Sequence, residues 1–421
     1  MSTVGIAAPG KPRGRLARVD VLRALAVLVV MVHHLVPPPD TAPRWAIDLV
    51  EMARRPAWIG VDLFFVLSGF LVSGLLFREH RLHGNLQIGR FLIRRGFKIY
   101  PSFYVFLFAT YFFGVYPQRA PMPHDLMLHA LFVQNYASWM PGVWAHTWSL
   151  AVEEHFYLLL AAFMAWRLRP GARLPTLRQA VTGFCVIGTL VLVSRVATAW
   201  AILSDPARGS IDLHFFATHL RIDALLFGVL LSFVYHHHPV AWERATSSRR
   251  TLALASALLL APSLFFPGPH PFTVTIGYTL YYLGFGCLLA LALPSTRPGA
   301  VPAAPGRVER LLAAIGAYSY SIYVWHSATK RWSAPVWGAL FNHPLGFVGQ
   351  SILYFVSSVV LGIAMAKVIE LPFLHWRDAA FPSRSNPPEL PPPVAVPAFA
   401  AASLPGTIPS PARVTETRRE L

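Results

Sequence analysis

The chain has 421 residues, of which 55% are hydrophobic and only 13% are charged, with a formal net charge of +17. Because soluble domains usually contain roughly 25% charged residues, this composition excludes an ordinary soluble enzyme. Apolar stretches of about 20 residues, the length needed to cross a bilayer, recur between residues 19 and 369. The sequence therefore predicts an all-α, polytopic transmembrane helical bundle, and no nucleic-acid partner is expected despite the positive charge.

Ten transmembrane spans are predicted, and the segments outside them differ in charge. The segments on one side, which include both termini, hold 25 Lys and Arg residues, whereas the loops on the other side hold 7. By the positive-inside rule, this difference places both termini in the cytoplasm, in a multi-pass protein of the cell membrane. The predicted spans are 19–36, 59–77, 100–116, 143–166, 179–203, 213–235, 251–266, 273–293, 311–329 and 348–369.

The two ends of the chain are predicted to be disordered, on either side of one transmembrane domain over residues 16–376. Residues 1–15 form a basic N-tail, and residues 377–421 form a cytoplasmic tail with 10 prolines in its last 40 residues. Proline-rich segments with few aromatic residues do not bury enough apolar surface to fold. Cys185 and Cys287 fall within predicted spans, so we expect neither a disulfide nor a metal site.

The first span carries ionisable residues, which a membrane interior tolerates only when they are paired or hydrated. At 100° per residue, Arg23 and His34 lie about 20° apart around a helix, and Asp20 lies about 40° from His34. These three residues therefore form one polar stripe, whereas His33 points about 100° away from His34. The alternative interpretation is that Asp20 and Arg23 are interfacial residues and that the histidines cap the outer end of the helix.

The second span and the basic segment after it also hold polar candidates. Asp62 lies near the outer end of this span, and Ser68 with the glycine after it suits close helix packing. In the basic segment, Arg94 and Lys98 are i, i+4 neighbours with Arg95 beside them. This segment either sets topology and contacts anionic lipid headgroups, or it binds the phosphates of a cytosolic co-substrate, since Arg suits bidentate phosphate contacts.

The fourth span opens with two adjacent carboxylates, Glu153 and Glu154, which are difficult to explain structurally within a membrane. Ser149, Glu153 and Tyr157 are spaced four residues apart and therefore share one face of a helix. Trp148 precedes this group. The pattern favours a functional site over a purely structural role.

Ionisable residues recur in the later spans. Arg221 and Asp223 in the sixth span are expected to form an internal ion pair, with a structural and a functional role equally supported. His326 ends an aromatic run in the ninth span, where a structural role is favoured over a catalytic one. Glu370 closes the tenth span and is expected to pair with Lys367.

The order of these segments resembles the integral-membrane acyltransferase family 3, over roughly residues 16–376. Two departures are Lys98, where the family usually has Arg, and His155, where Gln is common. No esterase-like domain follows the spans, which favours the stand-alone members of the family. The matching segments are Arg23 with His34, GVDLFFVLSGF (60–70), RRGFKIYP (94–101), TWSLAVEEHFY (147–157), RID (221–223), SYSIYVWH (319–326) and ELP (370–372).

The resemblance implies a membrane-bound O-acyltransferase that moves an acyl group, most often acetyl, from acyl-CoA to a hydroxyl. The acceptor would be a carbohydrate, a glycolipid or lipid-linked sugar, or a macrolide. Acyl-CoA is a co-substrate, and no tightly bound cofactor or metal is expected.

The candidate residues fit this activity. The acyl-CoA phosphates would bind Arg94, Arg95 and Lys98, and the pantetheine arm would follow the Asp20–Arg23–His34 stripe. His34 would act as general base or as an acylated nucleophile, with Glu153 or Glu154 orienting an imidazole or binding the acceptor. The expected catalytic residues are thus His34, Asp20, Arg23, Glu153 and Glu154. The expected substrate-binding residues are Asp62, Ser68, Trp148, Ser149, Tyr157, Arg221, Asp223 and His326.

Two other functions are considered. A proton-coupled transporter or flippase of a lipid-linked sugar would use the buried ionisable residues as a proton path, but it would predict inverted repeats, and none is seen in the sequence. A non-catalytic membrane sensor would not need the basic segment and the histidine stripe together.

Overall fold

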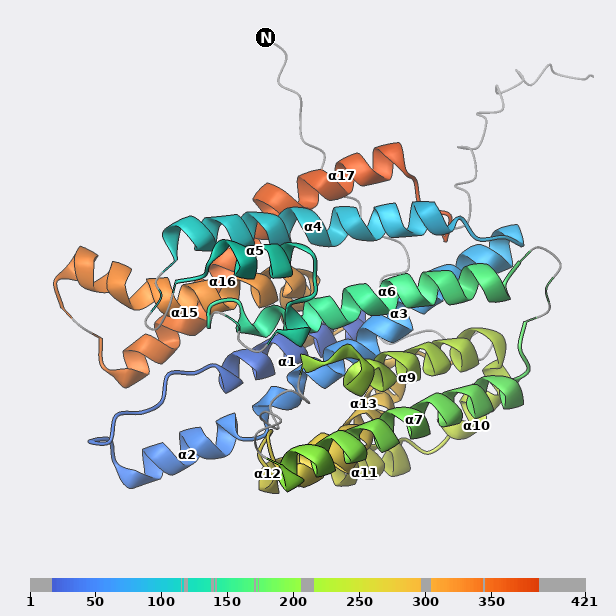
Figure 1. Ribbon diagram of the computed structural model, residues 1–421, viewed down its shortest axis with the longest axis horizontal. Helices are drawn as coiled ribbons and strands as arrows, with labels where there is room; N and C mark the ends of the chain where they lie inside the picture. Colours follow the sequence, from blue (N-terminus) through green and yellow to red (C-terminus); the bar gives the residue numbers. More distant parts are fainter. Residues whose placement is uncertain are drawn as a thin grey trace, which may run out of the picture. The chain divides into compact units, whose positions relative to one another are not determined.

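The computed structural model of the protein describes residues 17–114, 116, 120–137, 140, 142–169, 172, 174–205, 216–296, 304–343 and 345–385. Within these residues every regular element is a helix and there is no strand, as Figure 1 shows. The predicted all-α fold is therefore confirmed. The predicted N-tail over residues 1–15 lies outside the described residues, as does the predicted tail from residue 386 onward.

The helices follow one another with short connections. The α-helices are α1 (Ala17–His33), α2 (Arg44–Arg54), α3 (Gly60–His83), α4 (Ile88–Phe113), α5 (Pro123–Ala130), α6 (Trp148–Arg167), α7 (Leu177–Ser204), α9 (Thr218–His237), α10 (Pro239–Ala245), α11 (Arg249–Leu260), α12 (Pro262–Phe265), α13 (Tyr278–Ala292), α14 (Arg307–Ala317), α15 (Ser319–Phe341), α16 (Phe347–Met365) and α17 (Leu371–Ala380). The shorter segments are the 3-10 helices η1 (Ala57–Ile59), η2 (Gln134–Tyr136) and η3 (Ala145–Thr147), and the π-helices η5 (Thr273–Gly277) and η6 (Ala366–Glu370).

Helical structure covers most of each predicted span, but two predicted boundaries are wrong. The span 311–329 is two helices, because α14 ends at Ala317 and α15 begins at Ser319. The basic segment after the second span belongs to α4, in agreement with the helical spacing of Arg94 and Lys98. Helix α17 continues to Ala380, so the predicted tail was set to begin too early at residue 377.

Five helical stretches among the described residues are long and apolar enough to cross a membrane. Ten spans and cytoplasmic termini therefore stay predictions, although the apolar helices agree with a multi-pass membrane protein. The five stretches are Arg44–His83, Leu177–Ser204, Thr218–His237, Thr273–Ala292 and Phe347–Ala380.

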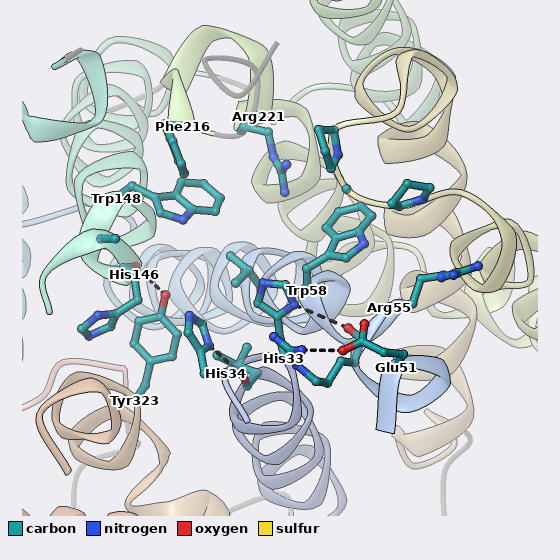
Figure 2. Close-up of a pocket in the computed structure, with 17 residues that line it drawn as sticks. His33, His34, Glu51, Arg55, Trp58, His146, Trp148, Phe216, Arg221 and Tyr323 are labelled. Carbon is teal, nitrogen blue, oxygen red and sulfur yellow. Dashed lines mark hydrogen bonds and ion pairs between the residues drawn. The ribbon is translucent and has the colours of Figure 1, made fainter. Parts of the chain in front are cut away.

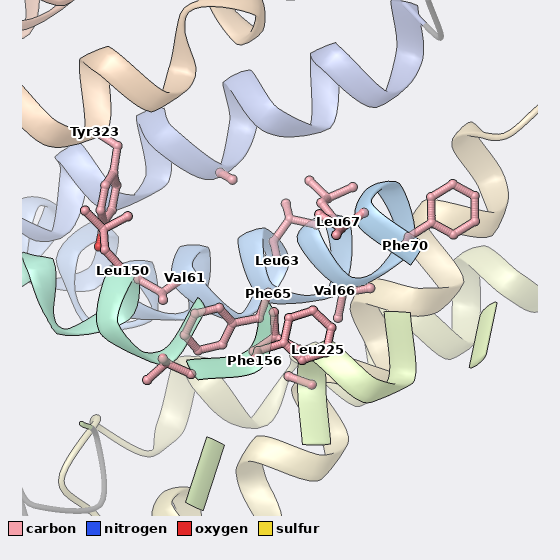
Figure 3. Packing of buried hydrophobic residues seen from close by; sticks show 14 of the residues in the cluster. Val61, Leu63, Phe65, Val66, Leu67, Phe70, Leu150, Phe156, Leu225 and Tyr323 are labelled. Atoms are coloured by element: carbon pink, nitrogen blue, oxygen red, sulfur yellow. The ribbon is translucent and has the colours of Figure 1, made fainter. Parts of the chain in front are cut away.

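Helix α3 lies at the centre of the packing and contacts α1, α6, α9 and α13. Its buried side chains meet Leu150 and Phe156 of α6 and Leu225 of α9 in one apolar cluster, which Figure 3 shows. The crossing of α3 and α9 depends on glycine, because a Cβ on Gly69 would lie 2.0 Å from the Leu225 carbonyl oxygen. Small residues allow membrane helices to approach this closely. The predicted packing role of the glycine after Ser68 is confirmed.

Helix α1 is held from two sides by close contacts. A Cβ on Gly60 of α3 would lie 2.9 Å from the Ala26 carbonyl oxygen, and one on Gly316 of α14 would lie 1.8 Å from the Asp20 carbonyl oxygen. These crossings leave one face of α1 directed toward α4, α6 and α15, where Arg23 and His34 border cavities. Helix α17 packs along α4 (Figure 1).

Candidate active site

Three neighbouring cavities run between the helices that carry the predicted site residues. The basic cavity, of about 240 Å³, lies between α3, α4 and α17. The central cavity, of about 200 Å³, lies between α1, α3, α4, α6 and α15. The histidine cavity, of about 490 Å³, is lined by α1, α2, α3, α6, α9 and α15. Adjacent cavities share walls: Arg95 and Lys98 line the first two, and Val61 and Tyr323 line the last two.

His34 follows the last residue of α1 and lines the histidine cavity. Its Nδ1 lies 2.9 Å from the Val30 carbonyl oxygen one turn earlier, so Nδ1 carries a proton and donates it. In a neutral imidazole, Nε2 then holds a lone pair and is the atom available as a base or nucleophile. Figure 2 shows the ring between His33 and Tyr323, and its centroid lies 5.0 Å from those of His33 and His326.

Two further histidines lie near His34: the His326 ring neighbours His34, and the His146 ring neighbours His326. The Nδ1 of His326 lies 2.5 Å from the Tyr323 carbonyl oxygen, and the Nε2 of His146 lies 3.1 Å from the Val324 carbonyl oxygen. The remaining ring nitrogens of both, His326 Nε2 and His146 Nδ1, have no hydrogen-bond partner among the described residues. The two rings are 4.7 Å apart. His146 lines the histidine cavity and was missed by the sequence analysis, whereas the predicted substrate-binding residue His326 does not line it.

The central cavity contains a chain of hydrogen bonds between α3 and α6. The Tyr157 hydroxyl donates to Glu153 Oε2 at 2.5 Å, and the Ser68 hydroxyl lies 2.6 Å from the same tyrosine oxygen. Arg23 of α1 lines this cavity and pairs with Asp20 at 3.4 Å. The structure therefore brings these five predicted residues together, although the stripe on α1 borders two cavities rather than one.

Glu154 points away from both of the cavities that α1 borders. Adjacent residues of a helix diverge by about 100°, so Glu154 points to a different side from Glu153. Its Oε2 accepts a hydrogen bond from the Tyr100 hydroxyl at 3.1 Å. Neither Glu153 nor Glu154 contacts His34, whose ring is held by the Val30 carbonyl instead. The structure therefore gives neither carboxylate the role of orienting His34, and the alternative expectation, that one of them binds the acceptor, stays a prediction.

The basic cavity collects the three predicted co-substrate residues, Arg94, Arg95 and Lys98. Arg94 is paired with Asp378 of α17 at 2.9 Å. The Arg95 guanidinium has no carboxylate partner among the described residues and lies over the rings of an α4 phenylalanine and an α6 tyrosine. The three side chains thus share a wall but differ in how strongly protein carboxylates already neutralise them.

Lys98 forms an ion pair with Glu370 of η6. Glu370 is buried and also accepts a hydrogen bond from Ser321 of α15 at 2.6 Å. The predicted pairing of Glu370 with Lys367 is wrong, because the carboxylate turns inward toward α4 while Lys367 is exposed.

A buried charge network lies beside the histidine cavity. Arg221 of α9 pairs with Asp62 of α3 at 2.6 Å, while Asp223 pairs with Arg195 of α7. The predicted pairing of Arg221 with Asp223 is wrong, since residues two apart on a helix point to different sides. Arg221 and Trp148 line the cavity (Figure 2), but Asp62 and Asp223 do not. Arg195, the partner on α7, was not identified from the sequence.

Tyr323 lies at the boundary of the central and histidine cavities and lines both, and we refer to its ring as the partition. Its hydroxyl donates to the His146 carbonyl oxygen at 2.7 Å, and the Ser149 hydroxyl lies 2.6 Å from it. Together with Val61, this ring is a common wall of both cavities. Ser149 is thus placed on the central side, where it holds the partition rather than lining the histidine cavity.

Helix α2 supplies polar groups to the histidine cavity that the sequence analysis missed. Glu51, Arg54 and Arg55 line the cavity, and Arg54 is paired with Glu51 at 2.7 Å. The carbonyl oxygen of Arg54 lies 3.5 Å from His33 Nδ1. The sequence signal was weak, because these residues were counted only as charges of an outer loop.

The sequence matches the model of the acyltransferase 3 family, described as "Acyltransferase domain", over residues 16–367. It is 26% identical over 338 residues to the peptidoglycan O-acetyltransferase OatA of Listeria monocytogenes, which covers 76% of this chain and 50% of that protein. It is also 26% identical over 327 residues to the O-acetyltransferase OatA of Staphylococcus aureus, which covers 73% of this chain and 49% of that protein. The chain spans about half the length of these curated relatives, and no solved structure matches it. Because the family match extends over most of the chain, from the polar stripe of α1 to η6, the protein belongs to the acyltransferase 3 family.

Proposed function

We propose that the protein is a membrane-bound O-acyltransferase that moves an acyl group, acetyl first among the candidates, from acyl-CoA to a hydroxyl of a carbohydrate, glycolipid or macrolide-type acceptor. The observation that carries this proposal is the series of three cavities with shared walls. It begins at a cluster of cations and ends at an imidazole with an available nitrogen. A phosphate-bearing donor at one end and a hydroxyl acceptor at the other would meet at this imidazole.

The donor enters from the basic cavity. Its phosphates bind the cations of α4, and its pantetheine arm extends through the central cavity along α1. From Arg23 to His34 the helix rises about 16 Å at 1.5 Å per residue, a length comparable to that arm. The acyl end passes beside Val61 and Tyr323, since these two residues line both cavities.

His34 carries out the chemical step through Nε2. As a general base, this nitrogen takes the proton of the acceptor hydroxyl while the oxygen attacks the thioester carbonyl. The carbon–sulfur bond then breaks, and the imidazolium returns the proton to the departing CoA thiolate. As a nucleophile, Nε2 instead attacks the thioester and releases the thiolate, and the acceptor hydroxyl then takes the acyl group from the imidazole while its proton goes to the thiolate. The Val30 carbonyl holds the ring in the tautomer that both routes need.

The acceptor occupies the histidine cavity, whose walls hold aromatic rings and hydrogen-bonding groups suited to a sugar, Trp58, Trp148 and Arg221 among them. Two of the curated relatives are O-acetyltransferases, and the name of one specifies peptidoglycan, a carbohydrate polymer. These names support a carbohydrate acceptor for this chain.

The proposal is tested by incubating membranes that contain the protein with labelled acetyl-CoA and a panel of sugars, glycolipids and macrolides. Mass spectrometry should find an acetylated product that is missing from membranes with the His34→Ala variant. Release of CoA without any acetylated product, or label that is independent of His34, would contradict the proposed transfer.

The proposed orientation places the basic cavity at the cytoplasmic face and the histidine cavity at the opposite face. It is tested with single cysteines introduced after Cys185 and Cys287 have been replaced. A cysteine within residues 80–98 should react with an impermeant reagent only in inverted vesicles, and one within residues 40–55 only in intact cells. Reaction at 80–98 in intact cells would reverse the orientation and remove the argument for a cytosolic donor.

A further inference from the structure

The segment that follows η6 closes the basic cavity. Arg377 at the end of α17, together with Ser383, Arg384 and Ser385, lines this cavity opposite α4. We refer to residues 377–385 as the closing segment. The sequence analysis assigned these residues to a disordered tail, so no role was expected of them.

The closing segment is fixed to the ends of α3 and α4 by specific contacts. Arg384 donates to Glu79 Oε1 at 3.0 Å and to Asn85 Oδ1 at 2.9 Å. Arg90 donates to the Pro382 carbonyl oxygen at 3.0 Å. These contacts place the closing segment over α4 in a defined position.

The charge of the cavity is strongly positive. Six cations line it: Arg90, Arg94, Arg95, Lys98, Arg377 and Arg384. The carboxylates that pair with them are Glu79, Glu370 and Asp378, and the last is shared between Arg94 and Arg377. Among the residues that the structure describes, three more cations than paired carboxylates therefore surround a space of about 240 Å³. A phosphate monoester carries about −1.5 to −2 charges at pH 7, so this excess fits a ligand with more than one phosphate.

We infer that the closing segment forms one wall of a binding site for the nucleotide phosphates of acyl-CoA, with Arg377 and Arg384 as phosphate ligands opposite Arg90, Arg94 and Arg95. This inference rests on the proposed acyl-CoA-dependent function and extends it to residues outside α4. Asp378 pairs with Arg94 and Arg377, and the ligand phosphates displace it. Arg suits this role because its planar fork binds phosphate through two parallel hydrogen bonds.

The test is equilibrium binding of CoA and of 3′-dephospho-CoA to the full chain in nanodiscs of phosphatidylcholine, measured by calorimetry. Arg377→Gln and Arg384→Gln should each raise the Kd for CoA about tenfold or more, which corresponds to about 1.4 kcal/mol. At least one of them should also reduce the preference for CoA over the 3′-dephospho form. Asp378→Asn should lower the Kd, because it frees two guanidinium groups. Arg250→Gln, an exposed arginine of α11 outside the cavity, should leave the Kd unchanged.

The outcomes separate this inference from the function it rests on. If the wild-type protein binds CoA and the Arg377 and Arg384 variants bind it equally well, the closing segment is structural only and the inference is wrong. If these variants bind CoA as the wild type does but bind phosphatidylglycerol in the nanodisc less tightly, the cavity holds a lipid headgroup instead. If the wild-type protein binds no CoA, the proposed donor itself is wrong. Because Arg384→Gln removes the cation that pairs with Glu79, the double variant Glu79→Gln/Arg384→Gln is measured as well, since it leaves no carboxylate without its cation.

Discussion

Replacing His34 by alanine removes the imidazole that lines the histidine cavity on the Arg23 face of α1, and acyl transfer should then be lost. His33 is the matched control, since it is the adjacent residue, has the same chemistry and lines the same cavity. Its Nδ1 lies 3.5 Å from the Arg54 carbonyl, so its ring is held less closely than that of His34 at 2.9 Å.

The size of the two effects follows from the contacts. Loss of a general base typically lowers the rate by about 10²–10⁴-fold, and we expect this range or more for His34→Ala. The cost in stability is small, because the variant loses one hydrogen bond to Val30, worth roughly 0.5–1.5 kcal/mol. The protein should therefore still accumulate in membranes. His33→Ala should keep most of the activity.

The assay measures labelled product from acetyl-CoA at equal amounts of membrane-inserted protein. His34→Gln provides a second comparison, because its amide can donate a hydrogen bond but cannot act as a base at neutral pH. Activity retained by His34→Ala and lost by His33→Ala would show that the helical register and the assigned catalytic nitrogen are both incorrect. If both variants stay active, the chemistry must be sought at His146 or His326.

Three other changes test the packing around the site. Gly69→Ala should strongly lower the thermal transition temperature and the amount of protein in the membrane, because its Cβ would lie 2.0 Å from a carbonyl oxygen of α9. Gly183→Ala should be tolerated, because among the described residues its Cβ would meet no atom outside its own helix within 4 Å. Equal behaviour of the two variants would refute the close crossing. Lys98→Met should destabilise the protein by about 3–5 kcal/mol, because it leaves the buried Glu370 without its cation. Adding Glu370→Gln should recover most of this loss in the same thermal assay. No recovery would mean that loss of the ion pair is not the cause. Tyr323→Phe keeps the ring but loses the hydroxyl contacts of the partition, so we expect faster hydrolysis of acetyl-CoA in the absence of acceptor. Unchanged release of CoA would show that these contacts do not close the path between the central and histidine cavities.

The sequence predicted the helices well, because long apolar runs and a period of 3.6 residues are properties of one segment at a time. The same period placed Arg23 and His34 on one face of α1, and the structure places both on the side that borders the cavities. Ser68, Glu153 and Tyr157 were each identified as candidates, and they meet in the central cavity.

The partners of the charged residues could not be predicted in this way. Arg221 contacts Asp62 from another helix, and Lys98 contacts Glu370 from the far end of the chain. Such pairs depend on how distant helices cross, and a single sequence holds no direct record of those crossings. Sequence proximity suggested local partners for these residues, and the structure contradicts both suggestions.

Short amphipathic helices were missed for a different reason. Helix α2 and the end of α17 are too short or too polar to be found by a search for membrane spans, yet each provides a wall of a cavity. Their sequences were therefore interpreted as loop and tail.

The partition at Tyr323 has a consequence for the membrane as a whole. An enzyme that takes its donor from one side of a bilayer and serves an acceptor on the other needs a path for the acyl group, but an open aqueous pore along that path would dissipate the ion gradients of the cell. Tyr323, which lines both cavities, is held by Ser149 and the His146 carbonyl. In the proposed orientation, the same ring would let a narrow acyl chain through and would keep the bulky nucleotide, and a conducting column of water, from crossing.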